Sequence, residues 1–166
     1  MDNYFFRNKR ISNLCDYLKK RLSLEEIATE YVSDPHVEEN PDYVEVLKRM
    51  ENKERNLTLT YSSTVVYEAD DENASEFERK KAGLDEQTVN EFLNSCTKTE
   101  EPTEWLTLIL NKGREVGKGT IKMACLINIR MNIYSPDHHL IMNSEKLEDS
   151  SDVIALAEEQ LKKYSL

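Results

Sequence analysis

The stretch around Gly113 contains residue types that bind phosphate groups in nucleotide-binding proteins. An apolar run, Leu106 to Leu110, precedes Gly113 and the pair Gly117-Lys118. In a P-loop, a strand leads into a glycine loop whose backbone amides surround the phosphates, and four residues separate the first glycine from the Gly-Lys pair. Only three residues separate them here, and residues 121–166 are too few for the remaining βαβ units of such a fold. The spacing argues against nucleotide binding. A small nucleotide-binding enzyme that uses Lys118 nevertheless stays as one alternative besides those given below.

Histidine and cysteine are the other residues that could carry chemistry. His138 and His139 are adjacent, so their rings diverge on a helix or a strand and do not form a metal pair. Cys15, Cys96 and Cys125 are odd in number and widely spaced without a CxxC pair, which is typical of buried thiols in a reducing compartment. No serine lies in a nucleophile elbow. We therefore predict no metal, no cofactor and no enzymatic activity.

Composition narrows the class of protein further. The chain has 166 residues, of which 39% are hydrophobic, and this suits one domain with a single core. Four glycines and four prolines are few for the turns of an all-β fold, so the composition favours helices. A net charge of −10 would repel nucleic acid. No apolar run reaches the roughly 18–20 residues of a membrane span, so we expect no transmembrane anchor. The cysteine pattern, typical of a reducing compartment, favours an intracellular location.

Apolar periodicity predicts six helical segments. A stripe with helical spacing begins at Ile11 and ends at Leu22, and a capping box at Ser23 and Glu26 would restart that helix. Further helices are predicted over 42–56, 84–96, 103–110, 116–134 and from about residue 151. The segment 116–134 is the most apolar and should lie in the middle of a bundle.

Two segments between these helices are harder to interpret. Residues 57–68 alternate in polarity and contain β-branched residues, which favours a strand, but a lone strand would have no partner. We therefore predict a helix or irregular structure there. Residues 70–81 are highly charged and are predicted to form a solvated loop.

This order of helices around one apolar helix resembles the Bcl-2 family of apoptosis regulators. Ile11 to Leu22 resembles the first helix of that family, Asn111-Lys-Gly-Arg114 resembles the Asn-Trp-Gly-Arg signature that opens its central helix, and Val153 to Leu161 resembles the following helix. Lys112 replaces the tryptophan of the signature, and such drift is similar to that of Bcl-2 homologues from large DNA viruses. The resemblance implies a single all-α Bcl-2-like bundle over residues 1–166.

The resemblance also implies a function and a site. A pro-survival protein of this family would bind the amphipathic BH3 helix of a pro-apoptotic protein in a surface groove. In the family the arginine of the signature pairs with an aspartate of the ligand, a role that would fall to Arg114, with Asn111 and Gly113 permitting close approach. The predicted groove walls are Met50, Val89, Phe92, Trp105, Ile109, Val116 and Ile121. Gly117 is predicted to lie where another helix or the ligand comes close.

Further partners and a location follow as expectations. The protein would act in the host cytoplasm, peripheral at mitochondria, and could form a homodimer. The alternative is a helical bundle that acts as a dimeric interaction protein and interferes with host immune signalling without binding BH3 helices.

Overall fold

The computed structural model describes residues 2–34, 42–79, 84–111, 115–116, 119–120, 124–131, 139–142, 145–148 and 153–166. Within them the chain forms antiparallel sheet and four helices, so the predicted all-α bundle is wrong. The helices are α1 (Lys9–Arg21), α2 (Asp71–Arg79), α3 (Glu86–Ser95) and α4 (Val153–Lys163). The strands are β1 (Glu25–Asp34), β2 (Tyr43–Asn52), β3 (Leu57–Glu68), β4 (Lys98–Thr99), β5 (Thr103–Leu110), β6 (Glu115–Val116), β7 (Gly119–Thr120), β8 (Ala124–Met131), β9 (His139–Met142) and β10 (Glu145–Glu148).

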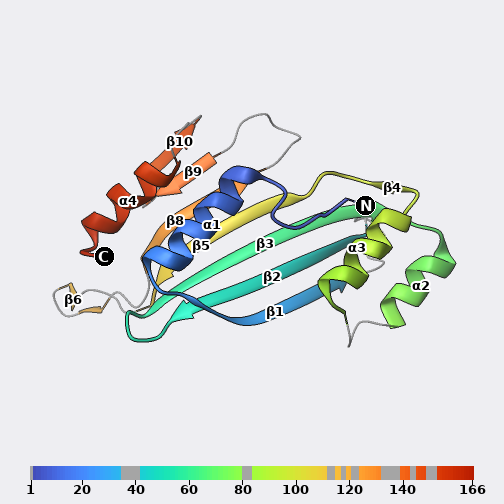
Figure 1. The fold of residues 1–166 in the computed structure, drawn as a ribbon, viewed down its shortest axis with the longest axis horizontal. Helices are drawn as coiled ribbons and strands as arrows, with labels where there is room; N and C mark the ends of the chain where they lie inside the picture. The colour runs from blue at the N-terminus through green and yellow to red at the C-terminus, as the bar shows by residue number, and fades with distance from the viewer. Residues whose placement is uncertain are drawn as a thin grey trace.

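The main sheet is an antiparallel meander. Seven of its strands follow the order β1-β2-β3-β5-β8-β9-β10, and β4 pairs with the end of β3. Strands β6 and β7 form a separate two-stranded pair. Figure 1 shows the strands side by side, with α1 across the middle of the sheet, α4 beside β8 to β10, and α2 and α3 together at the opposite end.

The segment 57–68 is a strand because it does have partners. β3 pairs with β2 on one side and with β5 on the other. Its burial alternates along its length: Leu57, Leu59 and Tyr61 are buried, whereas Thr58 and Thr60 are half-buried on the other face. The prediction of a helix or irregular structure for 57–68 was wrong because no partner strand was expected, although the alternation itself indicated a strand.

The partner strands lie in segments that were predicted to be helices. Residues 42–56 contain β2, residues 103–110 are β5, and the predicted continuation of the first helix is β1. Val44, Val46 and Met50 are buried at even positions of β2, so the alternation was present but coincided with helical spacing. A short amphipathic segment satisfies both patterns, and pairing with neighbours decides between them.

The apolar segment 116–134 is not a buried helix. Its described parts are β6, β7 and β8. Leu126, Ile127 and Ile129 of β8 are at most 1% exposed, so burial was predicted correctly while the secondary structure was not. A continuous apolar run predicts burial and does not distinguish a central strand from a central helix.

Three predicted helices are confirmed and one predicted loop is corrected. Helix α1 carries the expected buried stripe and is capped by Asn8, whose side chain accepts hydrogen bonds from the backbone amides of Arg10 and Ile11. Helices α3 and α4 lie within 84–96 and after 151 as predicted. The charged segment 70–81 contains α2 instead of a loop.

All four helices pack on the same face of the sheet. One core lies under α1 and α4 and includes Ile11, Leu59, Leu106, Ile127 and Leu161. A second core lies under α2 and α3. The side chains on the opposite face of β3, at Thr58, Thr60, Ser62 and Thr64, contact no described helix core and remain half-buried. Among the described residues, no helix has the length and apolar character needed to cross a membrane.

Candidate functional site

Helices α2 and α3 form a two-helix unit at one end of the sheet. Asp70 starts α2, because its carboxylate accepts a hydrogen bond from the backbone amide of Asn73 at 2.8 Å. Asp85 starts α3 in the same way, with the amide of Thr88 at 2.7 Å, and this hydrogen bond lowers the pKa of the Asp85 carboxyl. Both caps fix where the helices begin and hence how their side chains face each other.

Three aromatic rings hold this unit to the sheet. Phe77 of α2 stacks on Phe92 of α3 with ring centroids 3.9 Å apart, and Tyr67 of β3 meets Phe92 edge-on at 5.0 Å. Phe77 and Phe92 are 3% and 9% exposed. Such pairs add about 0.5–1.5 kcal/mol beyond the burial of their area. The stacked rings therefore form a rigid apolar floor between the two helices.

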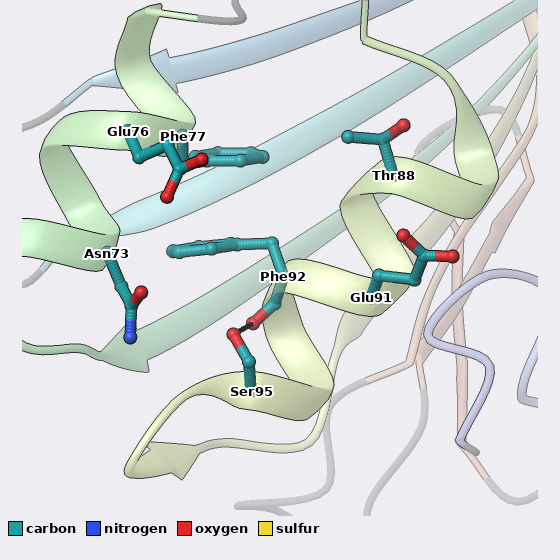
Figure 2. A pocket seen from close by; sticks show the side chains of 7 residues that line it. All are labelled: Asn73, Glu76, Phe77, Thr88, Glu91, Phe92 and Ser95. Carbon is teal, nitrogen blue, oxygen red and sulfur yellow. Dashed lines mark hydrogen bonds between the residues drawn. The ribbon is translucent and has the colours of Figure 1, made fainter.

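A pocket of about 210 Å³ lies over this floor. Figure 2 shows the two rings between the helices, with Glu76 on the α2 side and Glu91 and Thr88 on the α3 side. The Glu91 carboxylate accepts a hydrogen bond from Gln87 at 3.0 Å and therefore has a defined position. The complete lining consists of Asn73, Glu76, Phe77, Thr88, Glu91, Phe92 and Ser95.

Two more hollows flank the same helices. One of about 340 Å³ lies beside Tyr67, at the end of β3, and is lined by Asp42, Val66, Tyr67, Glu68, Ala69, Lys98 and Glu100. The other, of about 450 Å³, is lined by Asp2, Asn3, Glu86, Gln87 and Asn90. Together the three hollows are lined by seven acidic side chains and one basic side chain. We call this region the acidic end.

The size and chemistry of the first pocket restrict what it can hold. Pockets for free ligands are usually about 300–1,000 Å³, so a volume near 210 Å³ suits one side chain of a larger partner. Carboxylates at the rim and aromatic rings at the floor suit a cation with an apolar stem.

The described cysteines do not supply an activated nucleophile. Cys15 is buried, Cys96 half-buried and Cys125 exposed, so the expectation of buried thiols holds fully only for Cys15. Burial raises the pKa of Cys15 and of Cys96 to about 11, and partial desolvation raises the pKa of Cys125. A thiol with a raised pKa is mostly protonated at neutral pH and reacts slowly. In the part of the chain that the structure describes, no group of three or more His, Cys, Asp or Glu residues is arranged to hold a metal ion.

The predicted groove residues do not converge. Phe92 lines the α2–α3 pocket and Val89 is buried beneath α3, but Met50 lies in the core under α1 and α4. Trp105 and Ile109 lie on the face of β5 that no described helix covers.

Two of the remaining predicted residues, Asn111 and Val116, belong to the described part of the chain after β5. The backbone amide of Asn111 donates to the carbonyl of Asn56, just before β3, at 2.7 Å, and its side-chain amide donates to the Thr58 hydroxyl of β3 at 2.7 Å. Val116 lies in β6. Outside the described residues are Gly113, Arg114, Gly117 and Ile121.

Sequence reasoning missed Glu76, Phe77 and Glu91. A signal for α2 was present: Asp70 can cap a helix, acids fill the first turn, and Arg79 ends the segment. Phe77, the one large apolar residue of 70–81, then marks the buried side of that helix.

No family model, no curated protein and no solved structure matches this chain. The resemblance of three short segments to the Bcl-2 family stays a prediction, while the helical bundle that it implied is contradicted by the sheet.

Proposed function

We propose that this protein is a non-catalytic binding module that takes a lysine- or arginine-rich segment of a protein partner at its acidic end. The observation that supports this proposal is the lining of the three adjacent hollows, with seven acidic side chains against one basic one. The α2–α3 pocket would hold one basic side chain, with its alkyl stem on the Phe77 and Phe92 rings and its cationic group between Glu76 and Glu91.

Energetics require a segment with several charges. An exposed ion pair contributes about 0–1 kcal/mol, so a single lysine would bind too weakly to matter. Several pairs spread over three hollows add up, and the net charge of −10 attracts a basic partner from a distance and raises its association rate. The proposal therefore concerns an extended basic segment with one anchored side chain.

Binding of BH3 helices stays a prediction, as does the intracellular location. BH3 binding was predicted from a groove between helices, but the described residues predicted to line that groove lie on both faces of the sheet. A BH3-type peptide therefore belongs in the test as a competing ligand.

Fluorescence anisotropy with a fluorescein-labelled octalysine peptide tests the proposal. We expect binding by the wild type, no binding of labelled octaglutamate, and about tenfold weaker octalysine binding by the double variant Glu76→Gln/Glu91→Gln, because two ion pairs are lost. The control is Glu72→Gln/Glu159→Gln, which removes the same charge from two exposed residues outside the pocket. Circular dichroism checks that each variant is folded.

Two outcomes would overturn the proposal. If octalysine binding weakened equally in both double variants, its affinity would depend on the total charge of the protein and not on the α2–α3 pocket. Absence of octalysine binding would overturn the proposal as well, and binding of an amphipathic BH3 peptide in that case would favour the earlier prediction instead.

A further inference from the structure

The face of the sheet that no described helix covers carries a row of aligned side chains across its central strands. We call it the open face. In the strand register, Leu47 of β2 faces Ser62 of β3, Ser62 faces Trp105 of β5, and Trp105 faces Arg130 of β8. These residues lie on the opposite side from the buried positions Leu59 and Tyr61. β5 is the middle strand of the seven-strand path, so Trp105 lies near the centre of this face.

Trp105 is unusual for a side chain on a free surface. It is 40% exposed, and the Arg130 guanidinium lies over its ring, 4.9 Å from the centroid. Tryptophan and arginine are the residue types that contribute most often and most strongly to protein interfaces, typically near the interface centre. Half-buried serine and threonine side chains surround the pair on β3 and β5. The open face thus has an aromatic centre with a neutral, hydroxyl-rich surround.

The area of the open face matches what a dimer needs. At about 3.3 Å per residue and about 4.8 Å between strands, the seven strands cover roughly 900 Å². A standard stable interface buries about 800 Å² on each partner. Two such faces can pack against each other as sheets do in a sandwich, with a spacing of about 10 Å.

Charge is lowest at the centre of this face. Two chains with a net charge of −10 repel each other, so close approach requires a surface with few acidic side chains. The acidic open-face positions Glu25, Glu30, Glu45 and Glu51 lie on the outer strands β1 and β2 together with Arg49, whereas Arg130 is the charged position beside Trp105 on the central strands. A two-fold axis near the middle strand would bring Trp105 against its own copy.

We propose that a second copy of this chain docks on the open face, sheet against sheet, with Trp105 near the two-fold axis. This proposal is independent of the proposed function, because the α2–α3 pocket that would hold the anchored basic side chain lies on the helix-covered side of the sheet.

Sedimentation equilibrium of the full chain from 1 to 200 µM tests the dimer. We expect the wild type to approach twice the chain mass of 19.4 kDa. Trp105→Lys should weaken dimerisation at least about 100-fold, because it removes a hot-spot residue and places a new charge at the centre of the interface in both copies. The matched control is Ile154→Lys, since Ile154 is 37% exposed but lies on α4, on the other side of the sheet.

The single tryptophan provides a second readout that does not depend on a variant. Its emission should shift to longer wavelength when the wild type is diluted through the dissociation constant, because Trp105 becomes more exposed to water. A monomer at 200 µM would overturn the proposal and leave the open face to a different protein. A dimer that Ile154→Lys disrupts as strongly, or whose Trp105 emission is constant on dilution, would also overturn it, because its interface would lie elsewhere.

Discussion

The carboxyl of Glu104 is a buried acid that links the N-terminal segment to the sheet. It is 2% exposed and accepts hydrogen bonds from the Tyr61 hydroxyl and from the backbone amide of Asn8, both at 2.8 Å. The Tyr61 oxygen in turn accepts the backbone amide of Phe6 at 2.7 Å, and the rings of Phe6 and Tyr61 stack. One buried carboxyl therefore fixes the segment before α1 to the sheet.

This arrangement predicts a specific pH dependence. Burial raises the pKa of Glu104 above its ordinary value, so its contribution to stability is complete below that ordinary value, about 4.3–4.5, and is lost as pH rises through the raised pKa. We expect the free energy of unfolding of the wild type to fall relative to that of Glu104→Gln between pH 4 and 7. Urea titrations of both proteins at each pH measure this difference. Glu159→Gln, an exposed site, controls for the loss of one charge. A difference that stays constant, or that grows in favour of the wild type, contradicts the prediction.

At the scale of the element, consecutive side chains of β3 point alternately to the covered face and to the open face of the sheet. Leu59 is fully buried under α1, whereas its neighbour Thr60 points to the open face and is half-buried. The same strand thus places consecutive residues in two different environments, which is what period-two alternation requires.

Two adjacent alanine variants test this division. Leu59→Ala should lower the free energy of unfolding by about 2–5 kcal/mol, because it leaves a cavity in the core. Thr60→Ala should change it by about 1 kcal/mol or less. Urea denaturation at low protein concentration measures both values with dimerisation minimised. Comparable losses at the two positions would mean that the open face is also packed within one chain.

At the scale of the whole molecule, charge is unevenly distributed. The chain has a net charge of −10, and acidic side chains gather in the hollows of the acidic end, whereas the central strands of the open face carry few charges around Trp105. Electrostatic interactions at exposed sites are screened over about 10 Å at 0.1 M salt.

The two proposed interactions should therefore respond to salt in opposite directions. Raising NaCl from 50 to 500 mM should weaken octalysine binding, because it screens the attraction, and should strengthen the dimer, because it screens the repulsion between two acidic chains. Anisotropy and sedimentation equilibrium at both salt concentrations measure the two effects. A dimer that weakens with salt would indicate an interface held by ion pairs instead of by Trp105 and its surroundings.

The sequence by itself determined many of the buried residues of this protein, but in several segments it did not determine whether those residues lie in a helix or a strand. The stripe of α1, the caps and stripe of α3, and the burial of Leu126 and Ile129 follow from apolar pattern and local hydrogen bonding. These properties depend on residues close in sequence, so they can be predicted without the fold.

Tertiary structure decided the choice between helix and strand in β2, β3, β5 and β8, because a strand is stabilised by partners that are distant in sequence. It also decided the site. Phe77 and Phe92 meet only because α2 and α3 fold onto the end of β3, and Trp105 and Arg130 meet only because β5 pairs with β8 in one register. Alternation within one segment does not identify the partner strand, which is why the sequence predicted the buried residues of this protein and not its sheet.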